Sequence, residues 1–174
     1  MEIKQINDQL RNDAIKFGLC QQWQDEWKED WSQEKMVEKM FKGIDFCLKY
    51  RYPSNQFIKD NFDLDFRRKS NVLVDDRYSL LNPPYALILG DSKATIRLNG
   101  RKSSIIYIHD WSRVELYASG SSFAIVHLLG DSRIEVEKKD RAHIAVISHS
   151  NDARLFASDP TVTFEKELNW PKIK

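Results

Sequence analysis

A repeat of 20 residues in the second half of the chain constrains the fold more than any other feature of the sequence. When residues 85–164 are written in rows of 20, apolar residues share columns, as Ala86, Ile106, Val126 and Val146 do. Each row predicts two strands of about five residues, each followed by a turn. The turn-forming residues recur at every tenth position, namely Gly90, Gly100, Asp110, Gly120, Gly130, Asp140, Ser150 and Pro160.

Stacked coils explain this pattern better than hairpins do. Coils of two strands place identical columns about 4.8 Å apart and bury the even-numbered positions in one core. An antiparallel meander or a double-stranded β-helix can also give a spacing near ten, but Gly-Asp-Ser at 90–92 returns in the same frame at 130–132, which favours coils. We expect a short β-solenoid of about four 20-residue coils. Its other apolar columns are Ile88, Ile108 and Leu128, and Ile96, Leu116, Val136 and Phe156.

Residues 1–61 are expected to form an N-terminal helical region, so the fold class is α+β. Apolar spacing predicts a helix over residues 4–17. Ser32 can cap a longer helix that runs to about Leu48, and Ser54 can cap a short one.

The segments on either side of the repeat carry no clear period. Residues 62–84 are expected to be a linker, because Pro83 and Pro84 mark its end. The solenoid is assigned to residues 85–165, and residues 166–174 are expected to be a C-terminal tail that helps to shield the last coil.

Three tryptophans in the helical region, Trp23, Trp27 and Trp31, fall at helical spacing. A buried packing stripe is favoured over an aromatic platform for nucleic-acid bases, because four acidic neighbours would repel phosphate. These neighbours are Asp25, Glu26, Glu29 and Asp30.

Composition and cysteine usage point to a soluble cytoplasmic chain. Lys plus Arg number 27 against 26 for Asp plus Glu, a formal charge of +1, so no global field favours nucleic acid or membrane. No apolar run approaches the roughly 20 residues of a membrane span. Cys20 and Cys47 lie in helical apolar patterns and are expected to be buried thiols.

The repeat resembles short right-handed β-helix modules, of which bactofilin-type polymers are the nearest soluble bacterial example. This resemblance is one of architecture. Left-handed hexapeptide acyltransferases and cupins fit less well, because the hexapeptide period and the HxH metal motif are missing. The segments GLCQQWQDEW, GIDFC and YPSNQFIKDNF are similar to small proteins of phages and mobile genetic elements in Bacteroidetes-like genomes.

Odd-numbered positions should face outward and carry any binding surface. One broad face is apolar, so we expect the N-terminal helices or a dimer partner to cover it. The other face, with Lys93, Arg113 and Arg133, is interpreted as an ordinary solvated surface. The candidate interaction or helix-docking face consists of Leu87, Leu89, Tyr107, His109, His127, Leu129, Ile147 and His149.

No metal, cofactor or catalytic residue is predicted. His109 and His149 lie two coils apart, near 10 Å, which is too far for shared coordination of one zinc ion. The repeated Gly-Asp-Ser segments are interpreted as turns whose side chains bond local backbone groups.

Basic residues at the corners and in the linker are candidate nucleic-acid contacts, although solvated loops are the simpler interpretation. They are Arg67, Arg68, Lys69, Arg101, Lys102, Lys138, Lys139 and Arg141.

We therefore expect a non-enzymatic protein-binding module, a monomer or homodimer that presents a rigid surface to a protein partner. The resemblance to phage and mobile-element proteins implies an inhibitor or regulator of a host factor. The alternatives are a nucleic-acid-associated accessory protein that uses the basic corners, and a small-ligand or carbohydrate enzyme built on a β-helix.

Overall fold

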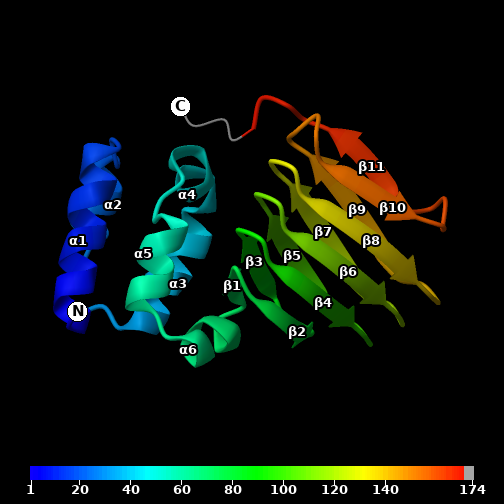
Figure 1. The fold of residues 1–174 in the computed structure, drawn as a ribbon, viewed down its shortest axis with the longest axis horizontal. Coiled ribbons are helices and arrows are strands. Elements are labelled where there is room, and N and C mark those ends of the chain that lie inside the picture. Colours follow the sequence, from blue (N-terminus) through cyan, green and yellow to red (C-terminus); the bar gives the residue numbers. More distant parts are fainter. Residues whose placement is uncertain (171–174) are drawn as a thin grey trace. The chain divides into compact units, whose positions relative to one another are not determined.

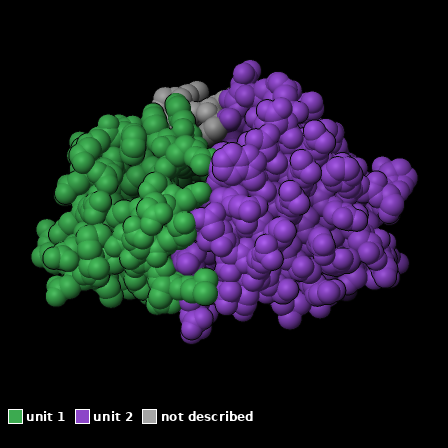
Figure 2. All heavy atoms as spheres, viewed as in Figure 1, with its two compact units in different colours: residues 1–64, 171–174 green, residues 65–170 purple. Residues whose placement is uncertain are grey.

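The computed structural model describes residues 1–170 as two compact units, residues 1–64 and residues 65–170 (Figure 2). The first unit is helical, and the second holds one short helix and eleven strands (Figure 1). The expected tail is described as far as Trp170, and its remainder lies outside the described residues.

Short amphipathic helices make up the first unit. The predicted caps are confirmed, because the Ser32 hydroxyl accepts a hydrogen bond from the Lys35 N–H and Ser54 accepts one from the Phe57 N–H. The helices are α1 (Ile3–Lys16), α2 (Gln21–Glu26), α3 (Gln33–Lys42), α4 (Ile44–Tyr50) and α5 (Asn55–Asn61), and α6 (Leu64–Lys69) begins where this unit ends.

The longer predicted helix is divided into α3 and α4 at Gly43. Glycine is a poor helix former, and here it is both the C-cap of α3 and the N-cap of α4. The cysteine prediction is half wrong: Cys47 is buried on α4, where burial raises the pKa of its thiol to about 12, but Cys20 is exposed.

The three tryptophans pack, but not as a stripe on one helix. Because α2 ends at Glu26, Trp27 and Trp31 follow it, and their rings lie 4.6 Å apart. Trp27 Nε1 donates a hydrogen bond of 2.8 Å to the side chain of buried Asn7. The Lys39 ammonium group lies 5.4 Å from the Trp31 ring and so covers it with positive charge.

The second unit contains the predicted β-solenoid of about four coils. Every strand pair is parallel, which excludes the antiparallel meander. Sheet A has the order β1-β3-β5-β7-β9-β11, and sheet B has the order β10-β8-β6-β4-β2. The strands are β1 (Val72–Val74), β2 (Arg77–Leu81), β3 (Tyr85–Leu89), β4 (Lys93–Leu98), β5 (Ser103–Ile108), β6 (Arg113–Ala118), β7 (Phe123–Leu128), β8 (Arg133–Lys138), β9 (His143–Ser148), β10 (Arg154–Ala157) and β11 (Thr163–Lys166).

The core lies between the two sheets and is built from the predicted columns. Even-numbered residues of β4 to β9 face inward, and Ile96, Leu116 and Val136 stack on sheet B opposite Ile106 and Val126 of sheet A. Branched aliphatic side chains suit this position, because each strand is buried on its inner face and pairs on both edges.

The corner residues keep the coils in register. Gly90, Asp110, Gly120 and Asp140 all have positive φ, which few residues other than glycine, aspartate and asparagine adopt. The Asp110 carboxylate accepts a hydrogen bond of 2.7 Å from the Gly90 N–H, one coil earlier. Asp140 repeats this contact with Gly120 at 2.8 Å. Each aspartate therefore ties its corner to the preceding coil.

The coils at the two ends depart from the 20-residue frame. In the last coil Arg154 pairs with Arg133, so one extra residue has been inserted and Leu155 takes the inward position. The prediction that Phe156 belongs to the inward column is wrong, because it pairs with Glu135 and is 54% exposed. At the other end, residues 62–84 contain α6, β1 and β2 rather than an irregular linker.

Replacing Gly120 by alanine tests the corner geometry. A Cβ there would lie 2.8 Å from the carbonyl oxygen of Gly100, and φ is +70°. We expect Gly120→Ala to lower the free energy of unfolding by about 2–3 kcal/mol in urea denaturation. Gly100→Ala is the matched control, because its φ is +68° but its Cβ would meet nothing within 4 Å. It should cost about 1 kcal/mol, and equal costs would contradict the close-packing argument.

Candidate functional site

The outward face of sheet B carries a column of five basic residues, one on each strand. The strand register aligns them side by side, and all five are exposed. Because neighbouring strands lie about 4.8 Å apart, the column spans roughly 19 Å. We call it the basic ladder, and it consists of Arg77, Lys93, Arg113, Arg133 and Arg154.

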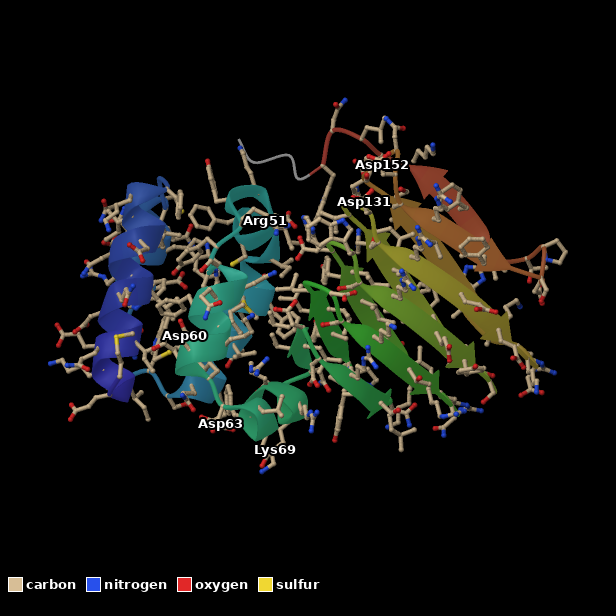
Figure 3. The ribbon with its side chains drawn as sticks, in the orientation of Figure 1. Arg51, Asp60, Asp63, Lys69, Asp131 and Asp152 are labelled. Atoms are coloured by element: carbon tan, nitrogen blue, oxygen red, sulfur yellow. The ribbon has the colours of Figure 1, made fainter. Side chains whose placement is uncertain are left out.

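Acidic columns flank the basic ladder on both sides. Two residues before Lys93, Arg133 and Arg154 lie Asp91, Asp131 and Asp152, which are exposed on the turns; Figure 3 labels the last two. Two residues after Arg113 and Arg133, Glu115 and Glu135 stand side by side on β6 and β8. The face therefore presents alternating negative, positive and negative columns rather than one basic field.

Aromatic rings interrupt these charged columns. Trp111 occupies the turn position that aspartate holds in neighbouring coils, and it is 67% exposed. The Arg97 guanidinium lies 4.9 Å from the Tyr117 ring, and the Tyr117 hydroxyl donates a hydrogen bond to Glu115. The negative charge of Glu115 raises the pKa of that phenol. An indole left this exposed is unusual on a protein surface and is typical of a contact residue.

The sequence analysis saw only part of the basic ladder. Lys93, Arg113 and Arg133 share a column in the 20-residue rows and were interpreted as a solvated surface. Arg77 lies 16 residues before Lys93, and Arg154 lies 21 after Arg133, so both fall outside the frame. The local pattern of a basic residue directly after a buried Asp, Ser or Ala could have found them.

The predicted interaction or helix-docking face lies on the outward side of sheet A. There Leu87, Leu89, Tyr107 and Leu129 are buried, whereas His109, His127, Ile147 and His149 are partly exposed. The expectation that the N-terminal helices or a dimer partner cover this face stays a prediction.

Part of this face is closed by the chain's own C-terminal segment. The rings of Tyr107 and His127 stack 4.8 Å apart, and Trp170 packs parallel to them at 5.3 Å from His127. His149 joins the same stack, with its ring centroid 4.3 Å from that of Trp170. Sequence reasoning missed this stack, because Trp170 lies outside the repeat.

Two of these histidines contact each other directly. Nδ1 of His127 lies 2.9 Å from Nε2 of His149, and Nδ1 of His149 lies 2.8 Å from the Glu167 carbonyl oxygen. Burial, and next the neighbouring His149, lowers the pKa of His127 to about 4. His109 is separate and accepts a hydrogen bond from the Asp110 N–H. Among residues 1–170, no group of three His, Cys, Asp or Glu side chains is arranged to hold a metal ion.

Of the eight candidate nucleic-acid contacts, three make contacts within their own unit and five are exposed. Arg67 is buried and donates to the Val74 carbonyl, and Arg68 forms a two-hydrogen-bond pair with Asp76, which lowers the pKa of that carboxyl. Lys138 lies near Asp159 and donates to Ala142.

The remaining candidates are exposed. Arg101 and Arg141 lie two coils apart in one corner column, with Ser121 between them. The hydrogen bonds between successive corners show this alignment: the Ser121 N–H donates to the Gly100 carbonyl, and the Arg141 N–H donates to the Gly120 carbonyl. The other exposed candidates are Lys69, Lys102 and Lys139. The corner therefore offers fewer aligned charges than the basic ladder does.

Comparison with known proteins leaves the architecture as the main guide. No family model matches the chain, and neither a curated protein nor a solved structure matches it. The resemblance to bactofilin-type modules is supported only as a β-solenoid that follows an N-terminal helical region. Among the helices of residues 1–170, none is both long enough and apolar enough to cross a membrane.

The histidine pair should make stability depend on pH. His127 has a pKa of about 4 in the folded chain and about 6.5 in the unfolded chain. Its contribution to the free energy of unfolding is therefore complete above pH 6.5 and is lost as the pH falls towards 4. For this partly exposed ring we expect a loss of about 1 kcal/mol between pH 7 and pH 5. Urea unfolding at a series of pH values measures it.

His127→Phe keeps an aromatic ring in the stack and should flatten this pH dependence. His143→Phe is the control, because it replaces an exposed histidine that stacks on Phe123 in another column of sheet A. The assignment would be wrong if both variants kept the slope of the unchanged protein.

Proposed function

We propose that the protein is a non-enzymatic binding module whose partner is another protein, bound on the outward face of sheet B. The observation that carries the proposal is Trp111, two-thirds exposed beside Arg113 in the middle of the basic ladder. Tryptophan, tyrosine and arginine are the residues that contribute most often to protein–protein binding energy.

The backbone of this face supports the same proposal. Its five strands are held by parallel pairing on a buried core, so the positions of the outward columns are set before any partner arrives. A preformed surface loses little conformational entropy on binding. The indole of Trp111 can supply apolar area, and the basic ladder can orient a partner by charge.

The alternating charge favours a protein over a nucleic acid. A phosphate backbone on the basic ladder would run between carboxylates such as Asp131 and Glu135, and this repulsion would offset much of the gain from the arginines. A protein surface with charges of both signs can complement all three columns. The similarity to phage and mobile-element proteins, which rests on sequence segments alone, makes a host factor the partner class within this proposal.

A paired-variant binding experiment tests the proposal. The purified protein, immobilised with and without nuclease treatment, captures its partner from the lysate of its host, and the captured protein is then purified and titrated. We expect Trp111→Ala to weaken that binding by about 2 kcal/mol, roughly 30-fold. Arg113→Glu should weaken it further and reduce the dependence of the association rate on salt.

The matched control is Arg101→Glu, which reverses an exposed charge at a corner of the solenoid. It should leave the affinity unchanged. Captured material that disappears with nuclease, and that responds to Arg101→Glu rather than to Trp111→Ala, would instead establish the nucleic-acid function of the corners.

A further inference from the structure

The C-terminal end of the solenoid is open. β10 is the outermost strand of sheet B and β11 is the outermost strand of sheet A, and within residues 1–170 no strand pairs with the far side of either (Figure 1, orange and red). Unpaired strand edges readily pair with another chain.

The apolar core is also open at this end. Phe164 aligns with Val146 and Leu155 aligns with Ile134, so both side chains continue inward columns. Val146 and Ile134 are buried, but Phe164 is 43% exposed and Leu155 is partly exposed. The last layer of the core therefore lacks the cover that the middle layers have.

The N-terminal end of the solenoid differs. Leu73 of β1 and Leu80 of β2 are inward residues and are both buried. Tyr78, which aligns with inward Ala94, is 41% exposed, but the Arg68 guanidinium lies over its ring at 4.6 Å. Arg67, from α6 of the same unit, donates a hydrogen bond to the Val74 carbonyl at the end of β1. Two arginines of α6, Arg67 and Arg68, therefore contact the N-terminal end of the solenoid.

The described part of the tail does not cover the open end. It was expected to shield the last coil, but Trp170 packs on the outward side of sheet A, against Tyr107, His127 and His149. Phe164 remains exposed with that segment in place.

The backbone groups that face outward at the open end belong to the same two residues. The Arg154 N–H donates to the Ser132 carbonyl of the preceding coil. Because successive residues of a strand direct their backbone groups to opposite edges, the N–H and C=O of Leu155 point to the free edge of β10. The Glu167 N–H donates to the Ser148 carbonyl of the preceding coil. By the same alternation, the N–H and C=O of Phe164 point to the free edge of β11.

We propose that a second copy of this chain covers the open end, with β10 and β11 pairing antiparallel with the same strands of that copy. This inference is independent of the proposed function, because it does not depend on Trp111 or on a partner bound to the basic ladder.

A single two-fold axis can satisfy both edges. Ile134 and Val146 lie six residues on either side of the corner residue Asp140, so Leu155 and Phe164, which stack on them, face each other across the core. An axis through both residues pairs each with its own counterpart, exchanging two hydrogen bonds per pair. Both apolar cores then become continuous.

The side chains fit this register. On β10 it places Arg154 opposite Phe156 of the second copy, and on β11 it places Thr163 opposite Glu165 of the second copy, so no like charges meet. A shift of one residue on β11 would bring two Glu165 carboxylates together, which is unfavourable. Because a two-fold contact uses the same surface on both copies, assembly through this end stops at a dimer.

Measuring mass against concentration tests the proposal. Analytical ultracentrifugation of the full chain over about a hundredfold concentration range should show a monomer–dimer equilibrium, and Tm should rise with concentration. Phe164→Glu should weaken dimerisation at least about tenfold and remove the concentration dependence of Tm. A monomer throughout would overturn the proposal and leave the edges to a strand from a different protein, and open-ended polymers would overturn it as well.

A cysteine pair tests the axis itself, should Phe164→Glu fail to fold. In a Cys20→Ser background, which removes the exposed native thiol, Phe164→Cys should form a covalent dimer under mild oxidation, because paired Cα atoms about 5.5 Å apart suit a disulfide. Trp111→Cys, at a more exposed position on a turn of sheet B, should remain monomeric on a denaturing gel. A folded Phe164→Cys variant that does not cross-link would refute the two-fold axis.

Discussion

The register between successive coils is the constraint on which the rest of this structure depends. It is fixed at the corners, where residues such as Gly90 and Asp110 adopt positive φ and an aspartate carboxylate bonds the N–H of the previous corner. A slip of one residue would turn every inward aliphatic side chain outward. The corners therefore decide which residues form the core and which form the outward faces.

Once the register is fixed, a repeat in sequence becomes a column in space. This has a cost on sheet B, because like charges side by side on neighbouring strands destabilise a sheet. The flanking carboxylates of Asp131 and Glu135 offset part of the repulsion within the basic ladder. A basic residue nevertheless occupies this position even in the first and last coils, Arg77 and Arg154, where the spacing changes. Retention across changed spacing favours a role for the charge itself.

The sequence could predict the middle of the solenoid because there the repeat and the physics coincide. Turn formers at every tenth position and aliphatic residues at even positions allow only the register in which residues 20 apart pair. The strands from β4 to β9 pair in that register. The ends could not be predicted in this way, since an extra residue before Arg154 moved Phe156 outward and put Leu155 in its place. The stack of Trp170 on His127 was equally invisible, because it joins a residue outside the repeat to one within it.

A stacked fold must also resolve its two ends, since every coil relies on its neighbours for cover. At the N-terminal end the chain does so itself, with Arg67 of α6 bonded to the end of β1. At the other end the sequence continues the core for one more layer, with Leu155 and Phe164, and then directs its described tail to the side of sheet A. Aromatic and aliphatic side chains placed on an uncovered layer favour association over solubility. The last coil therefore exposes side chains of the kind that protein interfaces bury.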